Sequence, residues 1–129
     1  MMLRAHNTLH RFFHILDGFE PAMSMGGLFA ADDATMHVAK ANLTLTGPEE
    51  IDAWCERMRK GWEGSPTLHV ESNVVLEELE PGLVINHSSW KALVGGSVSA
   101  YGTHEDVLEN VSGEWLFRRR VIKHRFSAG

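Results

Sequence analysis

Two histidines and one aspartate are the residues of this chain whose types and spacing best suit chemistry. His69 lies on a predicted strand over residues 67–77, and His87 lies on the next one, over 83–94. Histidines on adjacent antiparallel strands can meet across a sheet, where directly opposite Cβ atoms are about 5 Å apart. A nearby carboxylate could orient one imidazole, and Asp17 is the natural candidate if the first helix covers the concave face of the sheet.

Such a trio could carry out general acid–base chemistry. A histidine could remove a proton beside a carbonyl group or protonate a leaving hydroxyl, while Asp17 holds the ring or a water molecule. The alternative interpretation is that His69 and His87 are structural histidines, hydrogen-bonded in the core or solvated at the surface. Spacing alone leaves both interpretations open.

Three further histidines, His6, His10 and His14, follow one another at a spacing of four on the first predicted helix, with Asp17 three residues later. This spacing could place two imidazoles and a carboxylate around one metal ion. The same spacing arises on a solvated helix face, and no second cluster of metal-binding residue types follows in the sequence. We therefore predict no metal site and no cofactor. The single cysteine, Cys55, excludes an internal disulfide and has no activating neighbour, which predicts an inert thiol.

The composition indicates one globular domain over residues 1–129. A hydrophobic content of 43% allows a substantial core, and the net charge of −5 argues against a general nucleic-acid binder. No apolar run approaches the roughly 20 residues that span a bilayer. Polar residues from His6 to Arg11 interrupt the continuous apolar core that a signal peptide would need. We therefore expect a cytoplasmic protein that binds neither nucleic acid nor membranes.

The elements that must position these residues are helices in the first half of the chain and long strands in the second. In the first helix, four apolar residues recur at i, i+3, i+4 and i+7, which makes one apolar stripe, and Gly18 ends the helix. The patterns predict helices over 3–17 and 21–31, a short strand over 34–38, a loop or brief strand over 42–46, a third helix from 47, strands over 67–77 and 83–94, and a terminal hairpin over 97–126 that turns at 111–114.

This order of helices followed by a meander of antiparallel strands indicates an α+β fold. Helices would cover one face of a strongly curved sheet, because strands this long need a partner layer. The other face would be solvated or covered by a second copy of the chain.

The order of elements and several motifs resemble the SnoaL-like domains of the nuclear transport factor 2-like superfamily. The resemblance covers nearly the whole chain. It implies a cystatin-like cone, in which a curved mixed sheet wraps around the N-terminal helices and encloses an apolar cavity open at one end. The motifs that carry it are LDG at 16–18, LFAADDA at 28–34, LHVESNVV at 68–75, YGTHED at 101–106 and SGEWLF at 112–117.

The resemblance also implies a site. Relatives include polyketide cyclases, scytalone dehydratase, ketosteroid isomerases and the small subunits of ring-hydroxylating dioxygenases, and many are dimers through the outer face of the sheet. In dehydratase-like members, an aspartate at the end of the first helix and a histidine on the sheet flank the substrate; these positions match Asp17 and His69, and His87 matches a second cavity histidine. The residues expected to bind substrate are Phe13, His14, Trp54, Met58, Asn73 and Trp90.

The function that this resemblance implies is a lyase or isomerase of dehydratase or cyclase type, acting on an apolar cyclic or aromatic molecule through the Asp17–His69 pair, and a homodimer is expected. Dehydratase-like members also use tyrosines to polarise a carbonyl, and here the chain departs from them: its one tyrosine, Tyr101, lies in the terminal hairpin. Two alternatives stay open. One is a non-catalytic protein that binds a hydrophobic ligand, and the other is a structural small subunit of a dioxygenase-like complex.

Overall fold

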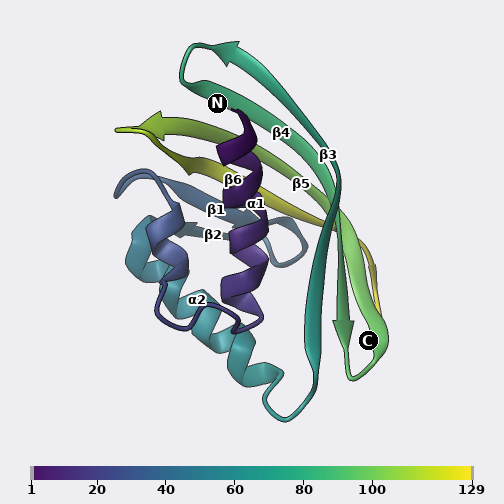
Figure 1. Cartoon of the computed structure of the whole chain (residues 1–129). Helices are drawn as coiled ribbons and strands as arrows, with labels where there is room; N and C mark the ends of the chain where they lie inside the picture. The colour runs from purple at the N-terminus through teal and green to yellow at the C-terminus, as the bar shows by residue number, and fades with distance from the viewer. Residues whose placement is uncertain (1, 129) are drawn as a thin grey trace.

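Six strands form one curved mixed sheet, and two α-helices lie along its concave face (Figure 1), in a computed structural model that describes residues 2–128. The strand order is β2-β1-β6-β5-β4-β3, with β1 parallel to β6 and every other pair antiparallel. The expected α+β cone is therefore confirmed. The elements are α1 (Met2–Leu16), β1 (Thr35–Val38), β2 (Leu43–Thr46), α2 (Gly47–Gly61), β3 (Thr67–Glu80), β4 (Leu83–Val94), β5 (Ser97–Val111) and β6 (Glu114–Ser127), with short 3-10 helices at Met25–Leu28 and Ala39–Ala41.

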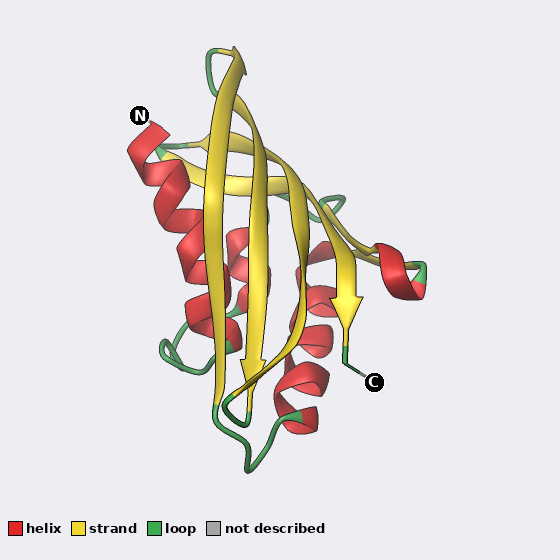
Figure 2. Ribbon diagram, turned by 90° about the vertical axis from the view of Figure 1, so that its right-hand side faces the viewer, coloured by secondary structure: helices red, strands yellow, loops and turns green. Residues whose placement is uncertain are grey.

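The helix α1 lies across the sheet because its apolar stripe is buried there. Each residue of the stripe is at most 5% exposed, and the ring of Phe12 contacts those of Trp54 on α2 and Phe117 on β6. Both α-helices lie on the same side of the sheet (Figure 2), so the core forms between them and the concave face. The stripe consists of Leu9, Phe12, Phe13 and Leu16.

The end of α1 is fixed by Gly18, which adopts a left-handed conformation with a φ of 84°. This conformation lets the amides of Gly18 and Phe19 donate to the carbonyls of Ile15 and His14, which closes the helix. Asp17 is therefore the first residue after α1.

A β-bulge in β3 changes which side chains face the concave side of the sheet. The register between β3 and β4 shifts around Asn73, whose φ is 53°. Before the bulge, His69 and Glu71 lie on the inner face, and after it Val74 and Leu76 pack against the core. As a result, odd-numbered residues of β3 face inward before the bulge, and even-numbered residues face inward after it.

The predicted helix over 21–31 is wrong. The segment is a turn followed by the 3-10 helix Met25–Leu28. Gly26 explains the difference, because its backbone lies so close to Pro48 that an added Cβ would come within 2.6 Å of the proline carbonyl oxygen. Because Gly26 has no side chain, this segment can pack closely against the start of α2.

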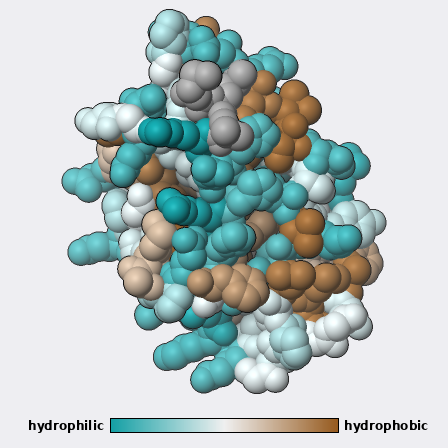
Figure 3. All heavy atoms as spheres, in the orientation of Figure 1, coloured by the Kyte–Doolittle hydropathy of each residue, from teal (hydrophilic) through white to brown (hydrophobic). Residues whose placement is uncertain are grey.

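The surface is mostly hydrophilic on the side of α1, with separate hydrophobic patches (Figure 3). None of the helices in the described part of the chain has the length and apolarity that crossing a bilayer requires.

Candidate functional site

A cavity of about 600 Å³ lies between the two α-helices and the concave face of the sheet. Its walls are mainly aliphatic and aromatic, while Lys40 and Arg57 add two cationic side chains to its lining. Such a volume suits a small cyclic molecule. Four of the six residues predicted to bind substrate line the cavity: Phe13, Trp54, Met58 and Trp90.

His69 lines this cavity and is held by Asp17. Its Nδ1 lies 2.6 Å from Oδ1 of Asp17, and its backbone amide donates to Oδ2 of the same carboxylate at 2.8 Å. The two side chains are only 4% and 2% exposed. Because a carboxylate accepts hydrogen bonds, Nδ1 carries the hydrogen of the neutral ring. Nε2 is then unprotonated, and it has no hydrogen-bond partner among residues 2–128.

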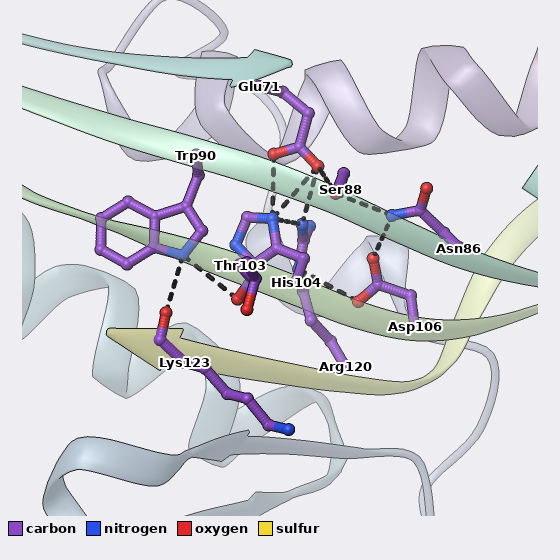
Figure 4. Close-up of polar contacts among 9 residues, drawn as sticks. All are labelled: Glu71, Asn86, Ser88, Trp90, Thr103, His104, Asp106, Arg120 and Lys123. Carbon is purple, nitrogen blue, oxygen red and sulfur yellow. Dashed lines mark hydrogen bonds and ion pairs between the residues drawn. The ribbon is translucent and has the colours of Figure 1, made fainter. Parts of the chain in front are cut away.

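A second histidine, His104 on β5, lines the same cavity. Its Nδ1 faces both the carboxylate of Glu71, with Oε2 at 2.9 Å, and the guanidinium of Arg120 (Figure 4). Complete burial and then the charge of Arg120 lower the pKa of His104 to about 4. The ring is therefore neutral at pH 7.

Glu71 and Arg120, the two partners of His104, belong to a larger network of buried polar side chains. Arg120 lies 3.4 Å from Glu71 and 3.3 Å from Asp106, and Asn86 donates to Asp106 and to Ser88, which donates to Glu71. Burial raises the pKa of Asp106 to about 6, against the charge of Arg120. Burial also opposes ionisation of Glu71, but hydrogen bonding to His104 and the Arg120 charge hold the pKa of that carboxyl below its ordinary value.

The placement of His87 is a correction. It was expected to share the cavity with His69, but it is exposed on the outer face because its neighbours Asn86 and Ser88 on β4 face inward. The strand register also separates the two histidines, since His87 pairs with Val75 whereas His69 pairs with a residue near the other end of β4.

Two further residues predicted to bind substrate lie outside the cavity lining. His14 is exposed on the solvent side of α1, with Nδ1 4.0 Å from the carboxylate of Glu20, because the apolar stripe turns the opposite side of the helix inward. Asn73 is exposed because it occupies the bulge of β3.

The sequence patterns predicted no functional role for Glu71, His104 or Arg120. A usable signal exists nevertheless, because Glu71 and Asp106 are opposite in charge to Arg120, and all of these residues occupy strands of the same β3–β6 meander. Finding it requires the register of all four strands, which includes the bulge in β3.

Cys55 is buried, and burial is the main cause that raises the pKa of its thiol to about 11. The thiol is therefore protonated at neutral pH, which agrees with the prediction of an inert thiol. Within the described residues, no group of three or more His, Cys, Asp or Glu side chains is placed to hold a metal ion.

Comparisons with known proteins match nearly the whole chain. A family model described as a SnoaL-like domain matches residues 3–121. A candidate scytalone dehydratase from Novosphingobium aromaticivorans is 20% identical, with a TM-score of 0.83 over 98% of this chain and 85% of that one. The protein Aln2 from a Streptomyces species is 25% identical, with a TM-score of 0.83 over 95% and 89%. A type 2 hexachlorocyclohexane dehydrochlorinase, LinA, is 14% identical, with a TM-score of 0.82 over 98% and 86%. A comparison with curated proteins gave no match.

Proposed function

The chain belongs to the SnoaL-like domain family, and we propose that it is a lyase or isomerase that removes a proton beside the carbonyl group of an apolar cyclic or aromatic substrate. The observation that carries this proposal is the Asp17–His69 pair in the wall of an apolar cavity. Both oxygens of Asp17 hold His69, so the ring keeps one orientation, with Nε2 available as a base.

In the proposed reaction, Nε2 of His69 accepts the proton from the carbon next to the carbonyl, and the electron pair of that C–H bond moves towards the carbonyl oxygen. The imidazolium, stabilised by the Asp17 carboxylate, then gives the same proton to a β-hydroxyl group, which leaves as water while a double bond forms. If the substrate has no leaving group, the proton returns to another carbon and the reaction is an isomerisation. No cofactor enters this scheme.

The names of two structural neighbours support this type of reaction. A dehydratase eliminates water and a dehydrochlorinase eliminates hydrogen chloride, and both neighbours share the fold. At identities of 20% and 14%, that likeness concerns the fold alone. The proposed chemistry therefore rests on the geometry of Asp17 and His69.

His69→Ala tests the proposal. Wild-type protein is incubated with a panel of cyclic and aromatic ketones that carry a β-hydroxyl group, and the conjugated product is followed by absorbance. Loss of the base is expected to lower turnover by about 10²–10⁴-fold. His87→Ala is the matched control, because it removes a histidine from the outer face of the neighbouring strand, and it should keep the wild-type rate. Undiminished turnover in His69→Ala would show that His69 is not the base.

A non-catalytic protein that binds a hydrophobic ligand is the second candidate, because the same apolar cavity would serve it. Calorimetry with the ketones of the panel separates the two functions. Binding without turnover, at an affinity that His69→Ala leaves unchanged, would favour a binding protein over an enzyme.

We also propose a homodimer through the outer face of the sheet. Tyr101 and Phe126 lie side by side there, with ring centroids 5.3 Å apart and exposures of 46% and 42%. Light scattering should give about twice the 14.4 kDa of one chain, and Tyr101→Lys should shift the mass towards the monomer. A monomeric wild-type protein at micromolar concentration would contradict this proposal.

A further inference from the structure

The cavity lining is positively charged, although the chain as a whole is acidic. Lys40 and Arg57 both line the cavity, whereas no aspartate or glutamate of residues 2–128 does so. The whole chain has 17 acidic residues against 12 lysines and arginines, and its net charge is −5. The lining therefore differs in sign from the rest of the protein, which favours a ligand with a negative charge.

Lys40 is the lining cation whose contacts the structure defines. It is exposed on the 3-10 helix Ala39–Ala41, and its Nζ donates to Oγ of Ser127 at 2.7 Å. Among residues 2–128, none of the salt bridges involves Lys40. An ammonium group has three donors, so two of them are available to a ligand. The charge of Lys40 also acts on the cavity wall, because it adds to burial in lowering the pKa of His124, which lines the cavity too.

A row of four residues, one from each long strand, crosses the sheet beneath the cavity. The register pairs His69 of β3 with Ala92 of β4. Ala92 pairs with Ala100 of β5, which in turn pairs with Ser127 of β6. All four residues line the cavity, and the two small alanines leave the space between the ends of the row open. Three strand spacings, roughly 14 Å along the sheet, therefore separate His69 from the serine that holds Lys40.

From these features we infer that the substrate carries a carboxylate, which Lys40 binds while the reacting carbon lies against His69. The apolar ring system of the substrate would lie over Ala92 and Ala100, between the two ends of the row. The inference rests on the proposed function, because it takes His69 as the reacting end. It adds the charge class of the substrate and the residue that selects it.

The charges at the two ends of the row give the bound molecule one direction. At one end, the carboxylate of Asp17 lies 2.6 Å from the ring of His69, where it stabilises an imidazolium but repels an anion. At the other end, the ammonium group of Lys40 attracts an anion. A substrate bound in reverse would lose this attraction and meet a like charge. The acid group is therefore remote from the reacting carbon, and it holds that carbon at Nε2 of His69.

Two naphthalene probes of matched shape test the charge preference without any turnover. Calorimetry with the full chain at pH 7 should give an affinity for 2-naphthoate about tenfold higher than that for 2-naphthamide, because a hydrogen bond between charged groups is stronger than one between neutral groups. Added salt should weaken the binding of 2-naphthoate and leave that of 2-naphthamide unchanged. Equal affinities for the two probes would overturn the inference.

Variants of Lys40 test which residue binds the anion. Lys40→Met keeps most of the length of the side chain but removes its charge, so the affinity for 2-naphthoate should fall by about tenfold while that for 2-naphthamide stays the same. Lys40→Glu should reverse the preference, so that the cation of 2-naphthylmethylamine binds more tightly than 2-naphthoate. Lys91→Met is the matched control, because it removes the same charge from an exposed position of β4 outside the cavity lining. Unchanged 2-naphthoate affinity in Lys40→Met would show that Lys40 is not the anion-binding residue.

Kinetics separate this inference from the proposed function. Lys40→Met should raise the KM of a β-hydroxy ketone with a remote carboxylate by about tenfold and leave kcat nearly unchanged, whereas His69→Ala should lower kcat and leave the affinity for 2-naphthoate unchanged. Undiminished turnover in His69→Ala, together with a 2-naphthoate preference that Lys40→Met removes, would refute the base but not the anion site. A neutral ketone with the same KM as its carboxylated analogue would refute the anion site but not the base.

Discussion

Asp17→Asn is expected to lower kcat by about 10³–10⁴-fold and to leave KM nearly unchanged. Asp17 accepts one hydrogen bond on each oxygen, from the ring and from the backbone amide of His69. Asparagine offers one acceptor and one donor. If its carbonyl oxygen keeps the backbone amide, its NH₂ group donates to Nδ1 and moves the ring hydrogen to Nε2. His69 then presents a donor to the cavity and is no longer a base.

The measurement for Asp17→Asn combines steady-state kinetics with the tautomer of His69. Two-bond ¹H–¹⁵N correlation spectra of histidine-labelled protein should show the ring hydrogen of His69 on Nδ1 in wild type and on Nε2 in the variant. Asp33→Asn is the matched control, because Asp33 is 74% exposed and pairs with the exposed Arg118. A variant that keeps kcat within about tenfold of wild type, or that keeps hydrogen on Nδ1, would show that Asp17 does not set the tautomer.

The orientation of His69 shows why strand alternation alone could not predict which side chains of β3 face the cavity. Alternation at one constant parity over β3 would place the apolar set that includes Val74 and Leu76 inward and would turn His69 outward. The bulge at Asn73 breaks that parity, so His69 and Leu76 both face inward. The resemblance to a known family gave the correct side, because it carried information about the cavity that the local pattern lacks.

Elements that depend on local rules were predictable. The apolar stripe of α1 and the stop at Gly18 follow from spacing and backbone freedom, and the terminal turn uses Ser112 and Gly113, with φ values of 53° and 91°. Residues whose burial depends on partners from other strands were not predictable. His87 had the right residue type, but it lies on the outer face, whereas His104 is buried because it contacts Glu71 and Arg120.

Arg120→Met is expected to lower the free energy of unfolding by about 3–5 kcal/mol. The guanidinium is completely buried, and it lies 3.4 Å from Glu71 and 3.3 Å from Asp106. It also lies over the rings of Phe12 and Phe117, at 4.2 and 4.7 Å from their centroids. Methionine keeps an apolar chain of similar reach, but it leaves two buried carboxyl groups without their cation.

The loss of stability in Arg120→Met should depend on pH with a definite sign. In wild type, the charge of Arg120 lowers the pKa of both Glu71 and Asp106, and the pKa of Asp106 is nevertheless about 6. Without the arginine, both folded-state pKa values rise relative to those in wild type. The variant therefore loses stability, relative to wild type, as the pH rises through these values, and the difference should be larger at pH 8 than at pH 5.

Urea unfolding at pH 5 and pH 8 measures this dependence. Arg119→Met is the matched control, because the neighbouring arginine is exposed on the opposite face of β6, and its effect should stay within about 0.5 kcal/mol. Adding Glu71→Gln to Arg120→Met should recover part of the stability, since it removes one of the two unpaired charges. A single variant as stable as wild type at pH 8, or equally destabilised at both pH values, would show that the buried carboxyl groups do not depend on Arg120 for their charge.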